Sequence, residues 1–177
     1  MKRNYYFDMD GVLADFHGAY TGNRADAMNR DWIANLKPFT ENVEIAKELI
    51  KAGNKVYISS LAASEDAKQG KLDWLAKYLP EIPAYRIIIM VGHANKAQHL
   101  KTKTGILIDD KKANCRQWEK AGMTAIWLET KGARITLNWE WFFYKGRDCL
   151  LINNQSAHPY PPYTPTRKMF RQKQKNV

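Results

Sequence analysis

Paired carboxylates follow two separate apolar segments of the 177-residue chain. The stretch DMDGVLADF places Asp8 and Asp10 one residue apart, and a later apolar run ends in Asp109 and Asp110. If the two runs are neighbouring parallel strands, four carboxylates converge at one edge of the sheet. Such a cluster needs a cation. Mg²⁺ prefers hard oxygen ligands and binds carboxylates together with substrate phosphate. The acids therefore predict a magnesium site for phosphoryl chemistry.

Two other segments supply groups that this chemistry needs. Ser59 and Ser60 follow a strand predicted over residues 55–58, and a hydroxyl there can hydrogen-bond a phosphate oxygen. Lys96 comes shortly after a strand predicted over residues 86–90. Its ammonium group can neutralise charge on a transferring phosphoryl group.

Short, nearly all-apolar segments alternate with helical patterns through most of the chain. Strands are predicted at 4–7, 55–58, 86–90, 105–108 and 124–128, and helices at 41–52, 65–78, 96–101 and 113–121. Thr40 and Ser64 are the expected N-caps of the first two helices. This alternation predicts an α/β fold with a doubly wound parallel sheet, in which ligands bind at the carboxyl ends of the strands.

The chain divides into a catalytic domain and a C-terminal region. The domain is predicted over 1–132, with a short, polar cap insertion at about 17–40 that interrupts the alternation. Residues 133–158 are rich in aromatic side chains and are expected to pack on the domain. Residues 159–177 are first Pro-rich and then basic, which predicts a flexible tail.

The charge of the chain is unevenly distributed. Net charge is +10, and residues 167–177 carry five basic and no acidic side chains, half of the excess. This tail is either a nucleic-acid-binding arm or simply a solvated segment. No apolar run approaches the roughly 20 residues of a membrane span. The N-terminus does not resemble a secretory signal, and two cysteines give no disulfide framework, so a cytoplasmic protein is expected.

The motifs DMDGVLADF, ISS, NK and LIDD occur in this order, each at a predicted strand end. This set resembles the phosphohydrolases of the haloacid dehalogenase (HAD) superfamily, over roughly residues 4–128. The closest similarity is to the 5′(3′)-deoxyribonucleotidase group and its bacterial and phage relatives. The resemblance implies a HAD-like, Rossmann-like sheet with a short cap insertion after the first strand.

The resemblance also implies roles for the four acids. Asp8 would be the nucleophile that forms an aspartyl-phosphate, and Asp10 would be the general acid and then the general base. Splitting hydrolysis into two steps in this way is covalent catalysis. Mg²⁺ would be held by Asp8, the backbone carbonyl of Asp10, and Asp110, with Asp109 assisting directly or through water.

The remaining site residues would contact the substrate. By the same resemblance, Ser59 and Lys96 would hold the phosphoryl group with Ser60 beside it, and Phe16 would pack against the substrate base with Trp32 as a second wall. Each also has a simpler interpretation: the serines as turn residues, Lys96 as a surface lysine, Phe16 as a core residue and Trp32 as an anchor of the cap.

The function favoured by the sequence is a Mg²⁺-dependent phosphatase, a phosphoric monoester hydrolase acting on (deoxy)ribonucleoside monophosphates. The short cap and the basic tail keep open a nucleic-acid end phosphatase that uses the same site. A third alternative is a non-catalytic binding module on a HAD fold. No membrane association is expected, and the protein is expected to be a monomer or a homodimer.

Overall fold

The computed structural model describes residues 2–92, 94–100 and 104–128. The C-terminal extension predicted at 133–158 and the tail predicted at 159–177 lie outside the described residues, so both stay predictions. The described residues form an α/β domain with a cap, as the sequence predicted.

A five-stranded parallel sheet forms the centre of the domain. Its strand order is β3-β2-β1-β4-β5, and Phe7 of β1 pairs with Ile58 of β2 and Ile108 of β4. The first and fourth strands are therefore neighbours, which is the arrangement that brings the two acidic pairs together. The strand bounds are β1 Asn4–Phe7, β2 Lys55–Ala62, β3 Ile87–Val91, β4 Ile106–Asp109 and β5 Thr124–Trp127.

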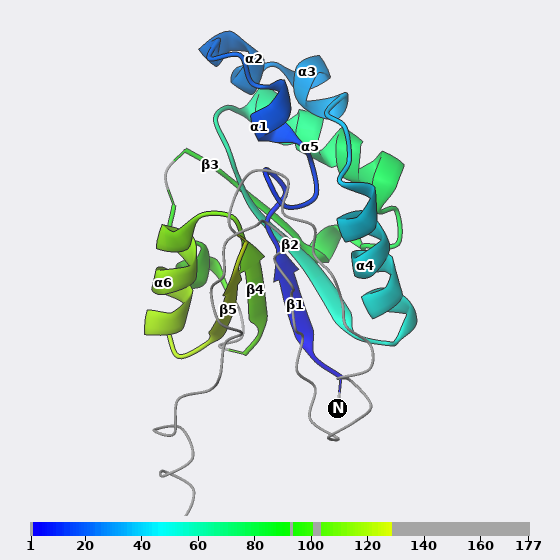
Figure 1. Ribbon diagram of the computed structural model, residues 1–177, viewed down its shortest axis with the longest axis vertical. Helices are drawn as coiled ribbons and strands as arrows, with labels where there is room; N and C mark the ends of the chain where they lie inside the picture. The colour runs from blue at the N-terminus through cyan, green and yellow to red at the C-terminus, as the bar shows by residue number, and fades with distance from the viewer. Residues whose placement is uncertain (1, 93, 101–103, 129–177) are drawn as a thin grey trace, which may run out of the picture.

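Helices cover both faces of the sheet. Figure 1 shows α6 on one side and α4 on the other. Ser64 caps α5 as predicted, because its hydroxyl accepts a hydrogen bond from the Ala67 amide at 3.0 Å. Thr40 is not an N-cap: it is the first helical residue of α4, and the N-cap position belongs to Phe39, whose side chain makes no capping bond. The bounds are α4 Thr40–Lys51, α5 Glu65–Tyr78, η1 Ala84–Arg86, η2 Lys96–His99 and α6 Lys112–Lys120.

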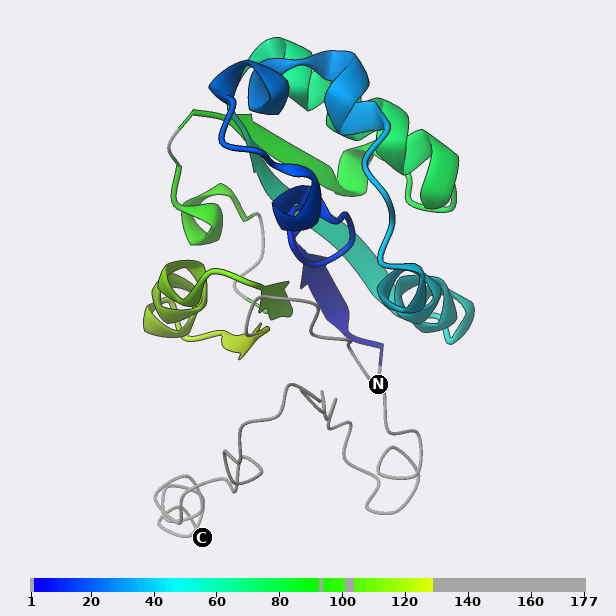
Figure 2. The same cartoon turned by 45° about the horizontal axis from the view of Figure 1, so that its top comes forward.

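The predicted insertion is a cap of three short helices beyond the carboxyl ends of the strands, next to α5 (Figures 1 and 2). The helices are α1 Phe16–Ala19, α2 Arg24–Met28 and α3 Arg30–Ala34. Helix α3 lies so close to α5 that a Cβ atom on Gly70 would collide with the Arg30 carbonyl. Arg30 also pairs with Asp73 at 2.6 Å, and the Trp74 indole donates to the Leu36 carbonyl at 2.8 Å. These contacts fix the cap on the sheet domain.

One strand boundary differs from the prediction in a way that affects the site. Strand β2 continues to Ala62, so Ser59 and Ser60 lie within it instead of following it. They pair with Ile88 and Ile89 of β3, and both are fully buried. Small hydroxyl side chains fit this buried position, and pairing with β3 extends the strand past the predicted end.

Candidate active site

Asp8 lies where β1 ends, between the two neighbouring strands. Its amide donates to the Ile108 carbonyl of β4 at 2.9 Å, so the ladder continues one residue beyond the strand. Its Oδ1 accepts a hydrogen bond from the Met9 amide at 2.8 Å. Burial alone would raise the pKa of Asp8, but Lys96 and Lys71 hold that pKa below its ordinary value. Asp8 is therefore an ionised, oriented carboxylate in a buried position.

Lys96 joins the two acidic pairs. Its ammonium group lies 3.0 Å from Asp8 Oδ1 and 2.6 Å from Asp109 Oδ2, and the residue is 2% exposed. Burial would lower the pKa of Lys96, but the two carboxylates raise it above its ordinary value. The surface-lysine interpretation is therefore wrong, and the side chain is a buried cation within the acidic cluster.

The second acidic pair is divided between two environments. Asp109 is the last residue of β4. The Asn114 amide group donates to both of its carboxylate oxygens at 3.0 Å. Oδ2 also accepts from Lys96, and Oδ1 accepts from the Lys111 amide. Asp110 Oδ1 is also buried, but it has no hydrogen-bond partner among the described residues. Asp109 is thus fully engaged by the protein, whereas Asp110 has an oxygen free for a ligand.

The acids fit a bound cation. Asp8, Asp109 and Asp110 each offer a carboxylate oxygen within 4.8 Å of the others. Burial and the nearby charge of Asp8 raise the pKa of Asp109 to about 6, and the same two causes raise the pKa of Asp110. Ionisation of Asp109 and Asp110 beside the ionised Asp8 is therefore disfavoured, and a divalent cation would remove that cost. Carboxylate oxygens alone, without thiolate or imidazole ligands, suit Mg²⁺.

The two serines face different surroundings. Because side chains alternate along a strand, Ser59 and Ser60 point to opposite faces of the sheet. The Ser60 hydroxyl accepts from Lys71 Nζ at 3.1 Å and, after the larger effects of the two lysines, helps to hold the pKa of Asp8 below its ordinary value. The Ser59 hydroxyl is buried with no partner in the described part of the chain. The structure thus brings Ser60 to the acids, the place the resemblance gave first to Ser59.

This difference predicts unequal effects of two matched substitutions. Ser60→Ala is expected to lower kcat/KM roughly 10-fold or more, because it removes a hydroxyl beside the reacting carboxylate. Ser59→Ala is expected to change kcat/KM by less than about twofold, since it removes a hydroxyl that bonds nothing there. Steady-state kinetics of both variants measure this. A larger loss in Ser59→Ala would contradict the assignment.

A second buried lysine reaches the site from α5. Lys71 Nζ lies 2.6 Å from Asp10 Oδ2, and the residue is 1% exposed. The sequence reasoning missed it, although a signal was present: Lys71 falls at helical spacing among the buried Ala67, Gly70, Trp74 and Leu75. A buried lysine within an apolar stripe needs an anionic partner, and the partly buried Asp10 is that partner.

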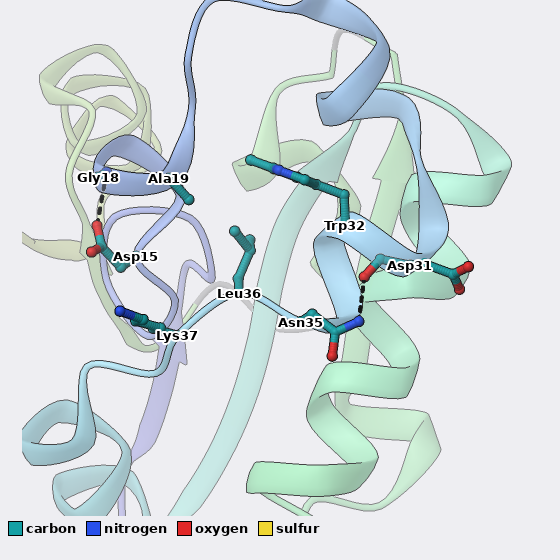
Figure 3. A pocket seen from close by; sticks show the side chains of 8 residues that line it. All are labelled: Asp15, Gly18, Ala19, Asp31, Trp32, Asn35, Leu36 and Lys37. Carbon is teal, nitrogen blue, oxygen red and sulfur yellow. Dashed lines mark hydrogen bonds between the residues drawn. The ribbon is translucent and has the colours of Figure 1, made fainter.

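The aromatic residues proposed to hold a base contact one another. Phe16 and Trp32 meet edge to face with ring centroids 5.4 Å apart, and Tyr20 stacks on Phe16 at 5.3 Å. The two rings therefore pack against each other within the cap, and their roles toward a substrate stay predictions. Trp32 also lines a pocket of about 560 Å³, and Figure 3 shows Ala19 of α1 facing it across this space. The other lining residues are Asp15, Gly18, Asp31, Asn35, Leu36 and Lys37.

The fold and this arrangement of acids and lysines agree with the resemblance of the sequence to the HAD superfamily. The family model described as 5′ nucleotidase, deoxy (pyrimidine), cytosolic type C protein matches residues 24–135, and the chain belongs to that family of phosphoric monoester hydrolases. The matched range contains Ser60, Lys96, Asp109 and Asp110. Asp8 and Asp10 precede it, so their place in the site rests on the structure.

A solved structure at 15% identity shares the fold. The "Structure of Pnkp1/Rnl/Hen1 complex" aligns with a TM-score of 0.56 at 15% identity, over 72% of this chain and 46% of that chain. A haloacid dehalogenase-like protein from Streptococcus pneumoniae aligns at 0.45 with 15% identity, over 72% and 84% of the two chains. A HAD family enzyme from Bacteroides thetaiotaomicron, in complex with magnesium and inorganic phosphate, aligns at 0.45 with 12% identity, over 81% and 100%.

Two further comparisons bear on the molecule. No curated protein matches the chain in sequence, and the chain spans less than half the length of the Pnkp1/Rnl/Hen1 component it matches.

Within the described residues, none of the helices has the length and apolar character needed to cross a membrane.

Proposed function

We propose that the protein hydrolyses the phosphate ester of (deoxy)ribonucleoside monophosphates in a Mg²⁺-dependent reaction through an aspartyl-phosphate. The observation that carries this proposal is the position of Asp8: an ionised carboxylate beside Lys96, within reach of Asp110 and its free oxygen. The family to which the chain belongs, described by deoxy and pyrimidine nucleotidase activity, supports a nucleotide substrate.

Asp8 would act as the nucleophile and Asp10 as the proton carrier. An Asp8 carboxylate oxygen forms a bond to phosphorus while the bond from phosphorus to the ester oxygen breaks. Asp10 in its protonated form gives its proton to the departing alcohol, and the resulting carboxylate then takes a proton from the water that releases phosphate from Asp8. Asp10 Oδ1 is buried and bonds no other described residue, so it is available for that proton, while Lys71 holds Oδ2.

The cations of the site would stabilise the transferring group. Lys96, Lys71 and the Ser60 hydroxyl surround Asp8, where negative charge gathers on the phosphoryl oxygens. Fixed charges in a buried site stabilise such charge strongly. Asp8, Asp110 and the Asp10 carbonyl would hold Mg²⁺, with Asp109 orienting Lys96. The ion supplies further charge neutralisation when it is bound.

The nucleoside would lie against the cap. The pocket beside Trp32 has the size of a small-molecule site. Its lining includes Trp32 and the polar residues Asn35, Asp31 and Lys37, and none of the four acids of the site. Phe16 meets Trp32 edge to face. A cytoplasmic location and a monomeric or homodimeric state stay predictions from the sequence.

The test is phosphate release from a panel of substrates in the presence of Mg²⁺. The panel contains deoxyribonucleoside and ribonucleoside 5′-monophosphates, 3′-monophosphates, 5′-phosphorylated oligonucleotides and a generic aryl phosphate. Preferential turnover of mononucleotides is expected. Turnover of the aryl phosphate alone would contradict a nucleotide substrate.

Mg²⁺ is expected to stabilise the folded protein. At a concentration 100-fold above its dissociation constant, a ligand specific for the folded state raises the free energy of unfolding by about 2.7 kcal/mol. Thermal unfolding in EDTA and in Mg²⁺ measures this shift. The Asp110→Asn variant is expected to show a smaller shift, because the substitution removes the charge of the carboxylate whose Oδ1 is free. An unchanged midpoint in the wild-type protein would count against the metal site.

A nucleic-acid end is the second candidate substrate. The half-exposed Trp127 favours this candidate. Its indole N–H donates to the Asp110 carbonyl at 2.8 Å. The ammonium group of Lys112 lies 4.6 Å from the centroid of its ring. An exposed ring beside basic side chains is typical of single-stranded nucleic-acid binding. Replacing the five basic residues of 167–177 with Gln in the full chain tests it. Loss of activity on oligonucleotides but not on mononucleotides would support this candidate.

A further inference from the structure

A histidine from the cap reaches the acidic cluster. His17, in the short helix α1, lies with Nε2 2.8 Å from Asp110 Oδ2. Its side chain is 48% exposed, whereas that of Asp110 is 2% exposed. The two residues are 93 positions apart in the chain. The contact therefore ties a half-exposed residue of the cap to a buried acid that follows β4.

The loop after Asp10 makes room for this contact. Gly11 has a φ of +74°, a conformation that side-chain-bearing residues rarely adopt. A Cβ atom there would lie 2.5 Å from Asp110 Oδ2 and 2.9 Å from His17 Cδ2. The turn thus passes directly beside the His17–Asp110 pair, and only glycine leaves the space that the pair occupies.

The cap holds His17 in place from both sides. Asp15 caps α1 by accepting a hydrogen bond from the Gly18 amide at 2.8 Å, which fixes the turn that carries His17. The preceding residue, Phe16, is held by its ring contact with Trp32. The position of the imidazole is therefore set by the cap, which is itself fixed on α5.

We propose that His17 is a positioning residue for metal binding: it holds one carboxylate oxygen of Asp110 so that the other is presented to the cation. The division of the carboxylate supports this, since Oδ2 accepts from His17 while the buried Oδ1 bonds no described residue. Groups that hydrogen-bond a metal ligand fix its orientation and commonly change metal affinity 10- to 100-fold. The inference rests on the proposed Mg²⁺ site.

The test compares Mg²⁺ binding by His17→Ala, His17→Gln and the wild-type protein, using isothermal titration calorimetry without substrate. His17→Ala is expected to weaken Mg²⁺ binding about 10-fold or more, since the carboxylate loses its partner. His17→Gln keeps an N–H donor at a similar distance from the backbone and is expected to retain most of the affinity. His99→Ala, at the exposed end of η2, is the matched control and is expected to bind as the wild type does.

Kinetics separate this role from a general loss of structure. The Mg²⁺ concentration for half-maximal activity is expected to rise in His17→Ala by the factor seen in calorimetry, with a smaller change in kcat at saturating Mg²⁺. Equal affinity in wild type and His17→Ala, or equal losses in the Ala and Gln variants, would overturn the inference alone. A wild-type protein that binds no Mg²⁺ would overturn both the inference and the proposed metal site.

Discussion

Replacing Asp8 with Asn is expected to abolish phosphate release from every substrate that the wild-type protein hydrolyses. The amide keeps the shape of the carboxylate but cannot attack phosphorus, so we expect kcat to fall about 10⁴-fold or more, as for other essential nucleophiles. The Asp8 carboxylate is held by a hydrogen bond from the Met9 amide and by the ion pair with Lys96. We therefore expect no neighbouring carboxylate to take its place as the nucleophile. Phosphate release with a saturating mononucleotide measures the loss.

A matched control and a chemical signature sharpen this prediction. Asp66→Asn changes the same side chain on the exposed first turn of α5 and is expected to leave activity near the wild-type value. Mass spectrometry of acid-quenched wild-type protein is expected to find phosphate on Asp8. If Asp8→Asn keeps full activity, Asp8 is not the nucleophile. If neither protein releases phosphate from any substrate, the alternative of a binding module gains support.

The sequence was sufficient to predict the sheet and the convergence of the acids. Strand β1 and helix α5 have the predicted bounds, because the aromatic run Tyr-Tyr-Phe and a helix with a Ser N-cap carry strong local signals. The placement of Asp8 beside Asp110 followed from a rule of topology: parallel neighbouring strands gather their carboxyl ends at one edge. The prediction also required β1 and β4 to be neighbours, which the sequence left as a condition and the strand order meets.

The features that the sequence left open depend on three-dimensional neighbours. Ser59 and Ser60 carry no local signal that says which of them faces Asp8; pairing with β3 extends the strand and decides it. The contact of His17 with Asp110 requires the turn at Gly11 and the position of α1 together. Phe16 was expected against the substrate base with Trp32 as a second wall, and the edge-to-face contact of the two rings depends on how the cap helices pack.

Lys71→Met is expected to damage both stability and catalysis, and the two losses can be separated. The Lys71 side chain is 2% exposed and lies 2.6 Å from Asp10 Oδ2. Removing one partner of a buried ion pair leaves the other charge uncompensated, so we expect the free energy of unfolding to fall by roughly 2–3 kcal/mol at neutral pH. Catalysis is expected to fall about 100-fold, because Asp10 loses the partner that orients it. Lys68→Met, one turn earlier and paired with Glu65 at the surface, is the matched control for both measurements.

The double variant Lys71→Met/Asp10→Asn distinguishes the two effects. Removing both charges of a buried pair is close to neutral for stability, so chemical denaturation is expected to show recovery towards the wild-type free energy of unfolding. Activity is expected to stay lost, because the amide that replaces the Asp10 carboxyl group carries no proton to the leaving group. Should Lys71→Met instead keep normal catalysis while losing stability, Lys71 would serve only to neutralise Asp10. A further outcome is a Lys71→Met protein that is fully folded under the assay conditions and still loses activity. That result would show that catalysis needs Lys71 to position Asp10.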